Sequence, residues 1–166
     1  MTTENISIRV AEVKDIPAII YVAEATWTYT YRDFISQEQI EFMYAEIYHP
    51  DALQKQMTEL AHTFLLLYLD EIPIAFASFA PRGADQTVFK LHKIYLLPDQ
   101  QGKGLGKVLI EEVCKRVREA GGLFLDLNVN RHNPARHFYE RCHFQIIREE
   151  DIPIGSFVMN DYVMRR

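Results

Sequence analysis

The sequence lacks the features that mark secreted and membrane-spanning proteins. Its 166 residues include two cysteines, Cys114 and Cys142, too few for a disulfide framework, so we expect buried thiols in a reducing compartment. No apolar run reaches the roughly 18 residues that a membrane-spanning helix needs. The N-terminus, MTTENISIRV, has no basic region followed by an apolar one. These absences predict a cytoplasmic protein without a signal peptide or a membrane partner.

Dense clusters of positive charge are missing as well. The chain has 18 Lys and Arg against 23 Asp and Glu, a net charge of −5, so we expect no nucleic-acid partner. An acidic chain suits a cationic ligand such as an amine. The sequence also has no internal repeat, low-complexity stretch or interdomain linker. Its length suits one domain over residues 1–166 with a sizeable core.

The spacing of apolar residues predicts strands and helices that alternate along the chain. Strands are expected at residues 6–10, 63–69, 74–79, 88–96, 123–129, 144–148 and 157–164. Helices are expected from Ile16, behind Asp15 as a cap, to a break in the pattern at Tyr29, and from Ser36 to about Tyr48. Further helices are expected over 50–60, from the loop at 101–107 to residue 120, and over 133–142. Summarised as β-α-α-β-β-β-α-β-α-β-β, the order indicates a mixed α/β fold around one sheet.

A glycine-rich loop joins the strand at 88–96 to the following helix. The loop consists of Gln101, Gly102, Lys103, Gly104, Leu105, Gly106 and Lys107. Glycine leaves backbone N–H groups uncovered and a helix N-terminus adds partial positive charge, so the loop is suited to hold a phosphate. The plainer alternative is a turn into a helix with no ligand.

Two standard nucleotide loops fit this stretch poorly. A Walker A loop needs Ser or Thr after its Gly-Lys pair, but Gly106 and Lys107 are followed by Val108. A dinucleotide fingerprint needs a third glycine where Leu109 stands. A nucleotide-binding protein therefore remains only an alternative.

Two segments in order resemble the motifs of the GNAT N-acetyltransferases. Residues 101–106 match the acetyl-CoA loop of that family, Q/R-x-x-G-x-G/A, and residues 133–144, NPARHFYERCHF, resemble its N-x-A-x-x-F-Y-E-x-x-G-F segment. The resemblance implies a single-domain fold with a mixed, mostly antiparallel sheet flanked by helices. It also implies an N-acetyltransferase that uses acetyl-CoA as co-substrate and needs no metal.

The resemblance assigns cofactor contacts residue by residue. The loop residues from Gln101 to Lys107 would hold the pyrophosphate. The backbone of Ile94, Tyr95 and Leu96 would pair with the pantetheine arm, and one of its N–H groups would polarise the thioester carbonyl.

An asparagine contact to the cofactor is less direct. His132 stands where the family often has Asn, and Asn133 follows it, so Asn133 would serve either the cofactor or the helix start. Asn128 and Asn130 are alternatives at the end of the preceding strand. His143 replaces a usual glycine, which changes a turn more than the chemistry.

The resemblance implies that Tyr139 is the general acid toward the leaving thiolate, and a phenol with a pKa of about 10 is protonated at neutral pH, as this role requires. Alternatively, it packs a helix on the sheet beside Phe138. The predicted base is His92 or Glu24, with a surface histidine as the alternative for His92. His132 and His137 have no carboxylate or cysteine at metal-ligand spacing, so no metal site is expected.

The acceptor is expected to contact residues 27–46 and the loop near 151–157. Aromatic residues from Trp27 to Phe34 either line a pocket or pack the first helices on the sheet. Asp33, Glu38 and Glu41 would attract a cation or form a solvated face. The layout resembles bacterial polyamine N-acetyltransferases, so a small primary amine is predicted.

Several alternatives stay open from the sequence. A peptide or protein N-terminus, an amino acid or an aminoglycoside would also serve as an acceptor. A catalytically silent acyl-CoA-binding module would use the same fold. The sequence does not decide between a monomer and a homodimer.

Overall fold

The computed structural model describes residues 4–166, which form seven strands, five α-helices and two short 3-10 helices. The strands are β1 (Ile6–Val10), β2 (Thr63–Leu69), β3 (Ile72–Arg82), β4 (Val88–Leu96), β5 (Phe124–Asn130), β6 (Gln145–Ile154) and β7 (Phe157–Arg165). The helices are α1 (Ile16–Tyr31), α2 (Gln37–Tyr48), α3 (Pro50–Thr58), α4 (Leu105–Glu119) and α5 (Ala135–Arg141). The 3-10 helices are η1 (Val13–Asp15) and η2 (Pro98–Gln100).

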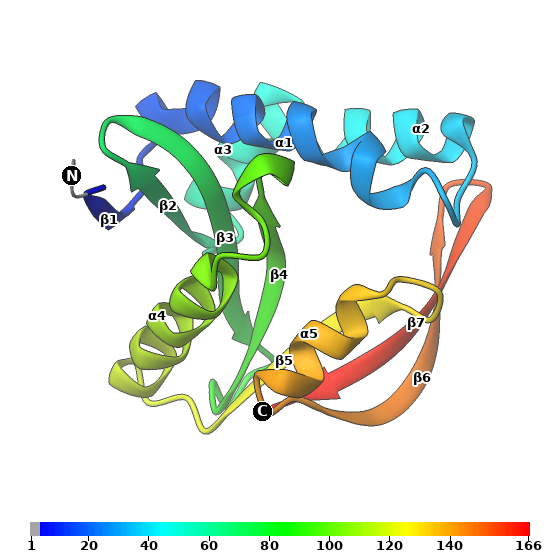
Figure 1. The fold of residues 1–166 in the computed structure, drawn as a ribbon. Helices are drawn as coiled ribbons and strands as arrows, with labels where there is room; N and C mark the ends of the chain where they lie inside the picture. Colours follow the sequence, from blue (N-terminus) through cyan, green and yellow to red (C-terminus); the bar gives the residue numbers. More distant parts are fainter. Residues whose placement is uncertain (1–3) are drawn as a thin grey trace.

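The strands form one sheet in the order β1-β2-β3-β4-β5-β7-β6. All neighbours are antiparallel except β4 and β5, which run parallel. These two strands pair only from Val88–Phe124 to Leu91–Leu127. Beyond that point they part, and the sheet opens into two halves, with α1, α2 and α3 together on one side and α4 and α5 apart from them (Figure 1).

Strand β3 forms the centre of the core because both of its faces are covered. Residues 74–80 are all buried, as expected for a strand enclosed between layers. Helix α1 packs against it through Ile19, Val22 and Ala23, which are fully buried. Helix α4 covers β3 and β4 from its own apolar stripe, which includes Leu109 and Ile110.

The structure confirms the predicted mixed α/β fold and corrects several details. The segment from Pro50 forms α3, so three helices, not the two of the summarised order, precede β2. Helix α1 continues to Tyr31, beyond the expected break at Tyr29. Asp15 does not cap α1 with its side chain; its carboxylate accepts hydrogen bonds from the Arg9 guanidinium and the backbone N–H of Glu12. Ser36 does cap α2, accepting from the Gln39 N–H at 3.1 Å.

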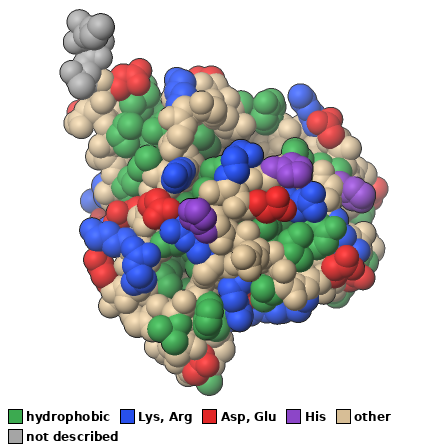
Figure 2. Space-filling view, turned by 60° about the horizontal axis from the view of Figure 1, so that its bottom comes forward, with side chains coloured by type: hydrophobic (Ala, Val, Ile, Leu, Met, Phe, Trp, Pro, Cys, Tyr) green, Lys and Arg blue, Asp and Glu red, His purple; other side chains and the backbone are tan. Residues whose placement is uncertain are grey.

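Among residues 4–166, no helix is both long and apolar enough to cross a membrane. On the face drawn in Figure 2, basic, acidic and histidine side chains are interspersed and do not gather by sign.

Candidate active site

A cleft of about 1710 Å³ opens where β4 and β5 part. A usual small-ligand pocket has roughly 300–1,000 Å³, so this cleft is larger than a single small ligand needs. Its walls come from α1, α2, the ends of β4 and β5, the glycine-rich loop, α5 and the β6–β7 hairpin. Residues that are far apart in sequence therefore meet around one opening.

The glycine-rich loop lies at one end of the cleft and leads into α4. Gly102 and Gly104 both have φ of +80°, and no atom of the described residues lies within 4 Å of where a Cβ would stand. Both positions need glycine for backbone conformation, and both leave the surface of the loop open. The first N–H groups of α4 have no partner within the helix, so they face the loop as donors.

Several other loop residues hold the loop in position against β4, the core and α5. Gln101 donates from Nε2 to the carbonyl of Leu96 at 3.1 Å, which ties the loop to the end of β4. Leu105 is buried in the core. A Cβ at Gly106 would lie 3.0 Å from the Phe138 ring, so glycine allows α4 and α5 to pack closely. Lys103 and Lys107 are exposed and supply positive charge at the loop.

The end of β4 has a free edge toward the cleft. On its other side, Ile94, Tyr95 and Leu96 pair with Ala77, Phe76 and Ala75 of β3. Because the pairing with β5 stops at Leu91, the backbone groups that point away from β3 remain open to an extended ligand.

His92 is the extra residue of a β-bulge in β4. The register passes from Ser78–Lys93 to Phe79–Leu91, which leaves His92 without an opposite residue on β3. Bulges re-aim side chains, and here the imidazole lies in the cleft, stacked on His62 with ring centroids 4.1 Å apart. Although His92 stays open to solvent, desolvation in the cleft and the neighbouring His62 and Lys90 lower its pKa well below the ordinary value, so the ring is neutral at pH 7.

Lys93 follows the bulge and is buried, with 8% of its surface exposed. Its Nζ donates to Gln56 Oε1 at 2.6 Å and lies 5.4 Å from the centre of the Phe64 ring. Burial, and then the charge of Lys90, lower the pKa of Lys93 to about 8. None of the site residues predicted from the sequence is this lysine.

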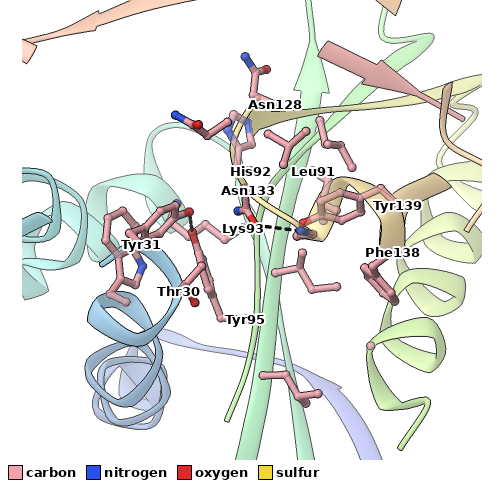
Figure 3. A pocket seen from close by; sticks show the side chains of 18 of the residues that line it. Thr30, Tyr31, Leu91, His92, Lys93, Tyr95, Asn128, Asn133, Phe138 and Tyr139 are labelled. Carbon is pink, nitrogen blue, oxygen red and sulfur yellow. Dashed lines mark hydrogen bonds between the residues drawn. The ribbon is translucent and has the colours of Figure 1, made fainter. Parts of the chain in front are cut away.

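Tyr139 on α5 points toward the cleft from the side opposite Tyr31 and Tyr95 (Figure 3). Burial, and then the neighbouring Tyr31, raise the pKa of Tyr139, so its phenol keeps its proton. The ring also packs on Phe144 at 5.9 Å and on Phe138 at 5.4 Å between centroids. The ring of Tyr139 therefore packs α5 as one of the two predictions states, while the residue also lines the cleft.

Asn133 takes part in the start of α5. Its Oδ1 accepts from the N–H of Ala135 at 2.9 Å, which is a local capping arrangement. Asn133 also lines the cleft, so its side chain lies both at the start of α5 and at the cleft wall. His132 is exposed beside it.

Aromatic side chains from α1 and α2 form the other wall. Trp27 packs between Tyr31 at 4.7 Å and Tyr48 at 5.4 Å, measured between ring centroids. The Tyr31 and Tyr95 hydroxyl oxygens lie 2.6 Å apart and share a hydrogen bond (Figure 3). Both predicted roles apply, because this aromatic group packs the helices on the sheet and also lines the cleft.

The family model for GNAT acetyltransferases, described as "Acetyltransferase (GNAT) family", matches residues 23–144, well over half of the chain. The chain belongs to this family. The match includes both the glycine-rich loop and Tyr139, so this GNAT protein carries the two motifs within the part that defines the family.

Known relatives agree with this assignment. This GNAT chain is 29% identical to a spermidine N(1)-acetyltransferase of Thermoplasma acidophilum over 93% of its own length and 96% of the relative. It is 24% identical to the uncharacterized N-acetyltransferase YuaI of Bacillus subtilis, covering 91% of this chain and 87% of that one. The crystal structure of the PaiA N-acetyltransferase from Thermoplasma acidophilum, in complex with coenzyme A, matches with a TM-score of 0.82 at 29% identity and covers 98% of both chains.

The structure does not bring Glu24 to this GNAT cleft. Glu24 is exposed on α1, where its charge acts on Tyr44 of α2, and it does not line the cleft. Of the two predicted bases, only His92 is placed there. Asp33 lines the cleft, whereas Glu38 and Glu41 are exposed on α2 outside it.

Asp161 is a cleft residue that the sequence analysis missed. It lies on β7, is 5% exposed, and accepts a long hydrogen bond of 3.4 Å from Asn128 Nδ2. Its signal in the sequence is an acidic residue on the inward face of an alternating strand, between the buried Met159 and Val163. Asn128, predicted as a cofactor contact, is therefore found beside a carboxylate of β7.

Proposed function

We propose that this protein is an acetyl-CoA-dependent N-acetyltransferase, formed by one domain over residues 1–166, that acetylates a small primary amine. A polyamine is the proposed acceptor class. The observation that carries this proposal is the cleft between β4 and β5, with the glycine-rich loop at one end and the Tyr139 phenol inside it.

The loop and the β4 edge suit the parts of acetyl-CoA. Backbone N–H groups between Gly102 and Lys107 would donate to the pyrophosphate oxygens, helped by the charges of Lys103 and Lys107. The open backbone edge from Ile94 to Leu96 would pair with the amide groups of the pantetheine arm. The amide of Asn133 is the side-chain contact that we assign to the same arm. Bound acetyl-CoA would supply the activated acetyl group.

Two side chains would move protons. The Tyr139 hydroxyl would donate to the leaving thiolate sulfur, since burial keeps the phenol protonated at neutral pH. The neutral imidazole of His92 would accept the proton of the attacking amine, directly or through water. A backbone N–H of the β4 edge would hold the developing oxyanion.

An amine acceptor is supported by two points. The cleft holds buried carboxylate at Asp161, and a desolvated carboxylate favours a bound ammonium. The relative from Thermoplasma acidophilum carries the name spermidine N(1)-acetyltransferase.

The test is an acceptor screen with the wild-type protein and acetyl-CoA, with thiol release as the readout. Spermidine, 1,4-diaminobutane, n-butylamine, amino acids and peptides with free N-termini form the panel, at pH 6.5 to 9. We expect turnover with small amines that rises with pH as more of the acceptor loses its proton. Turnover with peptides alone would reject the polyamine assignment, and binding of acetyl-CoA without turnover on any acceptor would favour a silent module.

A further inference from the structure

Three buried aspartates of the described chain differ in their partners. Asp15 is held by Arg9 at 2.8 Å, and Asp126 is held by Arg165 at 2.6 Å. Asp161 is as buried as these two, at 5% exposed, yet within residues 4–166 its carboxylate forms no ion pair within 4.0 Å. Removing a carboxylate from water without pairing it with a cation is unfavourable, so a buried carboxylate usually has a cationic partner.

Hydrogen bonds satisfy the carboxylate of Asp161 only in part. Oδ2 accepts the long bond from Asn128 Nδ2, while Oδ1 is buried and has no hydrogen-bond partner among the described residues. The same holds for Oδ1 of Asn128. Two buried acceptor oxygens thus lie on adjacent side chains that line the cleft. A primary ammonium brings three N–H donors and a positive charge, which meets both needs at once.

The charged groups around Asp161 do not already fill this role. Arg131 directs Nε to the backbone carbonyl of Asp161 at 3.4 Å and uses its guanidinium for Asp151 at 3.0 Å. Lys90 acts on Asp161 only at longer range, and Glu150, opposite it on β6, is of like charge. Desolvation has a larger effect than these neighbouring groups and raises the pKa of Asp161. A raised pKa is expected for a buried carboxylate that has no cation beside it.

We propose that Asp161, with Asn128, binds a second, non-reacting ammonium of the acceptor and so makes the enzyme prefer diamines and polyamines over monoamines. An ion pair with a carboxylate stabilises the protonated amine. The nitrogen held there is therefore a poor nucleophile, and the nitrogen that attacks has to be another one, which loses its proton elsewhere in the cleft. This inference rests on the proposed acetyltransferase function.

The test compares 1,4-diaminobutane with n-butylamine, which has the same carbon chain and one amino group, in wild type and Asp161→Asn. Wild type should show the higher kcat/KM with the diamine. In Asp161→Asn we expect the KM for the diamine to rise at least tenfold, with kcat/KM for n-butylamine and the affinity for acetyl-CoA unchanged. Glu119→Gln, which removes an exposed carboxylate at the end of α4, far from the cleft lining, is the matched control and should leave the preference intact.

A second pair of measurements separates ligand binding from structure and from turnover. Thermal unfolding at pH 7.5 should show Asp161→Asn as stable as wild type or more so, because the variant removes an unpaired buried charge. Calorimetry with 1,4-diaminobutane and the CoA-loaded protein should show binding to wild type and at least tenfold weaker binding to Asp161→Asn. Equal diamine binding by both proteins, or equal losses with both amines, would overturn the inference. Diamine binding that depends on Asp161 without any acetyl transfer would instead reject the proposed function and keep the subsite.

Discussion

The hydroxyl oxygens of Tyr31 and Tyr95 lie 2.6 Å apart and connect the last turn of α1 to the part of β4 that has lost its β5 neighbour. Tyr95 belongs to the strand edge that we assign to the pantetheine arm, and Tyr31 belongs to the aromatic wall from α1 and α2 that we assign to the acceptor. One hydrogen bond thus links the two halves of the cleft. Burial raises the pKa of Tyr31 to about 12, so both groups stay protonated at any working pH.

Removing this hydrogen bond should show energetic coupling between the two positions. Tyr31→Phe and Tyr95→Phe should each lower the free energy of unfolding by roughly 1 kcal/mol, because each leaves the other hydroxyl without its partner. The double variant should lose less than the sum, with a coupling energy of about 1 kcal/mol. Urea unfolding of the four proteins measures this cycle. Strict additivity would mean that the contact contributes nothing to stability.

Tyr139→Phe should lower kcat by roughly 10²–10⁴-fold, the range of general acid catalysis, with little change in acetyl-CoA affinity. The ring and its packing on Phe144 remain, so the fold is preserved. Tyr21→Phe, at an exposed position of α1, is the control and should retain full activity. Steady-state kinetics and calorimetry with acetyl-CoA give both quantities. An unchanged kcat would exclude Tyr139 from the proton transfer.

Two glycines with the same backbone strain allow the phosphate loop to be tested by itself. Gly104 has φ of +80° and Gly83, in the β3–β4 loop, has φ of +79°, and at neither would a Cβ meet a described atom within 4 Å. Valine at either site should cost roughly 1–2 kcal/mol of stability, the penalty for an L side chain in the left-handed region. Only Gly104→Val should also weaken acetyl-CoA binding, by at least tenfold. Equal affinity in the two variants would argue against the loop as the pyrophosphate site.

The stacked histidines should make the fold sensitive to mild acid. Burial, then the charges of Lys93 and Lys90, lower the pKa of His62 from 6.5 to about 4. The unfolded chain therefore takes up a proton near pH 6.5 and the folded chain only near pH 4, so stability is full above this window and falls as the pH drops through it.

His62→Phe, which keeps a ring to stack on His92, should flatten this dependence. The midpoint of thermal unfolding, measured from pH 7.5 to pH 4.5, should fall less in the variant than in wild type. The exposed His137→Gln serves as control and should follow the wild-type curve. A variant curve parallel to that of wild type would remove His62 as the source of the acid sensitivity.

Local features of this protein could be predicted from the sequence because their causes are local. Alternating apolar residues specified the strands, and the conformational needs of glycine marked the loop at 101–107, where the structure has left-handed φ at Gly102 and Gly104. The motif around Tyr139 likewise placed a phenol in the cleft. Errors fell at boundaries, as at Tyr29, where packing of aromatic rings extends α1 by a further turn.

The tertiary structure decided which polar residues lie in the cleft and which charged residues pair with each other. His92 and its rival Glu24 were both candidates for the base in the sequence, and only the tertiary structure shows that His92 lines the cleft whereas Glu24 lies on the surface of α1 outside it. Asp126 and Asp161 look alike in the sequence, as single carboxylates among buried strand residues. In the structure Asp126 lies directly opposite Arg165 in the β5–β7 register, whereas Asp161 lies opposite Asn130 and Glu150. Pairing across strands, which no local pattern encodes, gives Asp126 its cation and leaves Asp161 without an ion pair among the described residues.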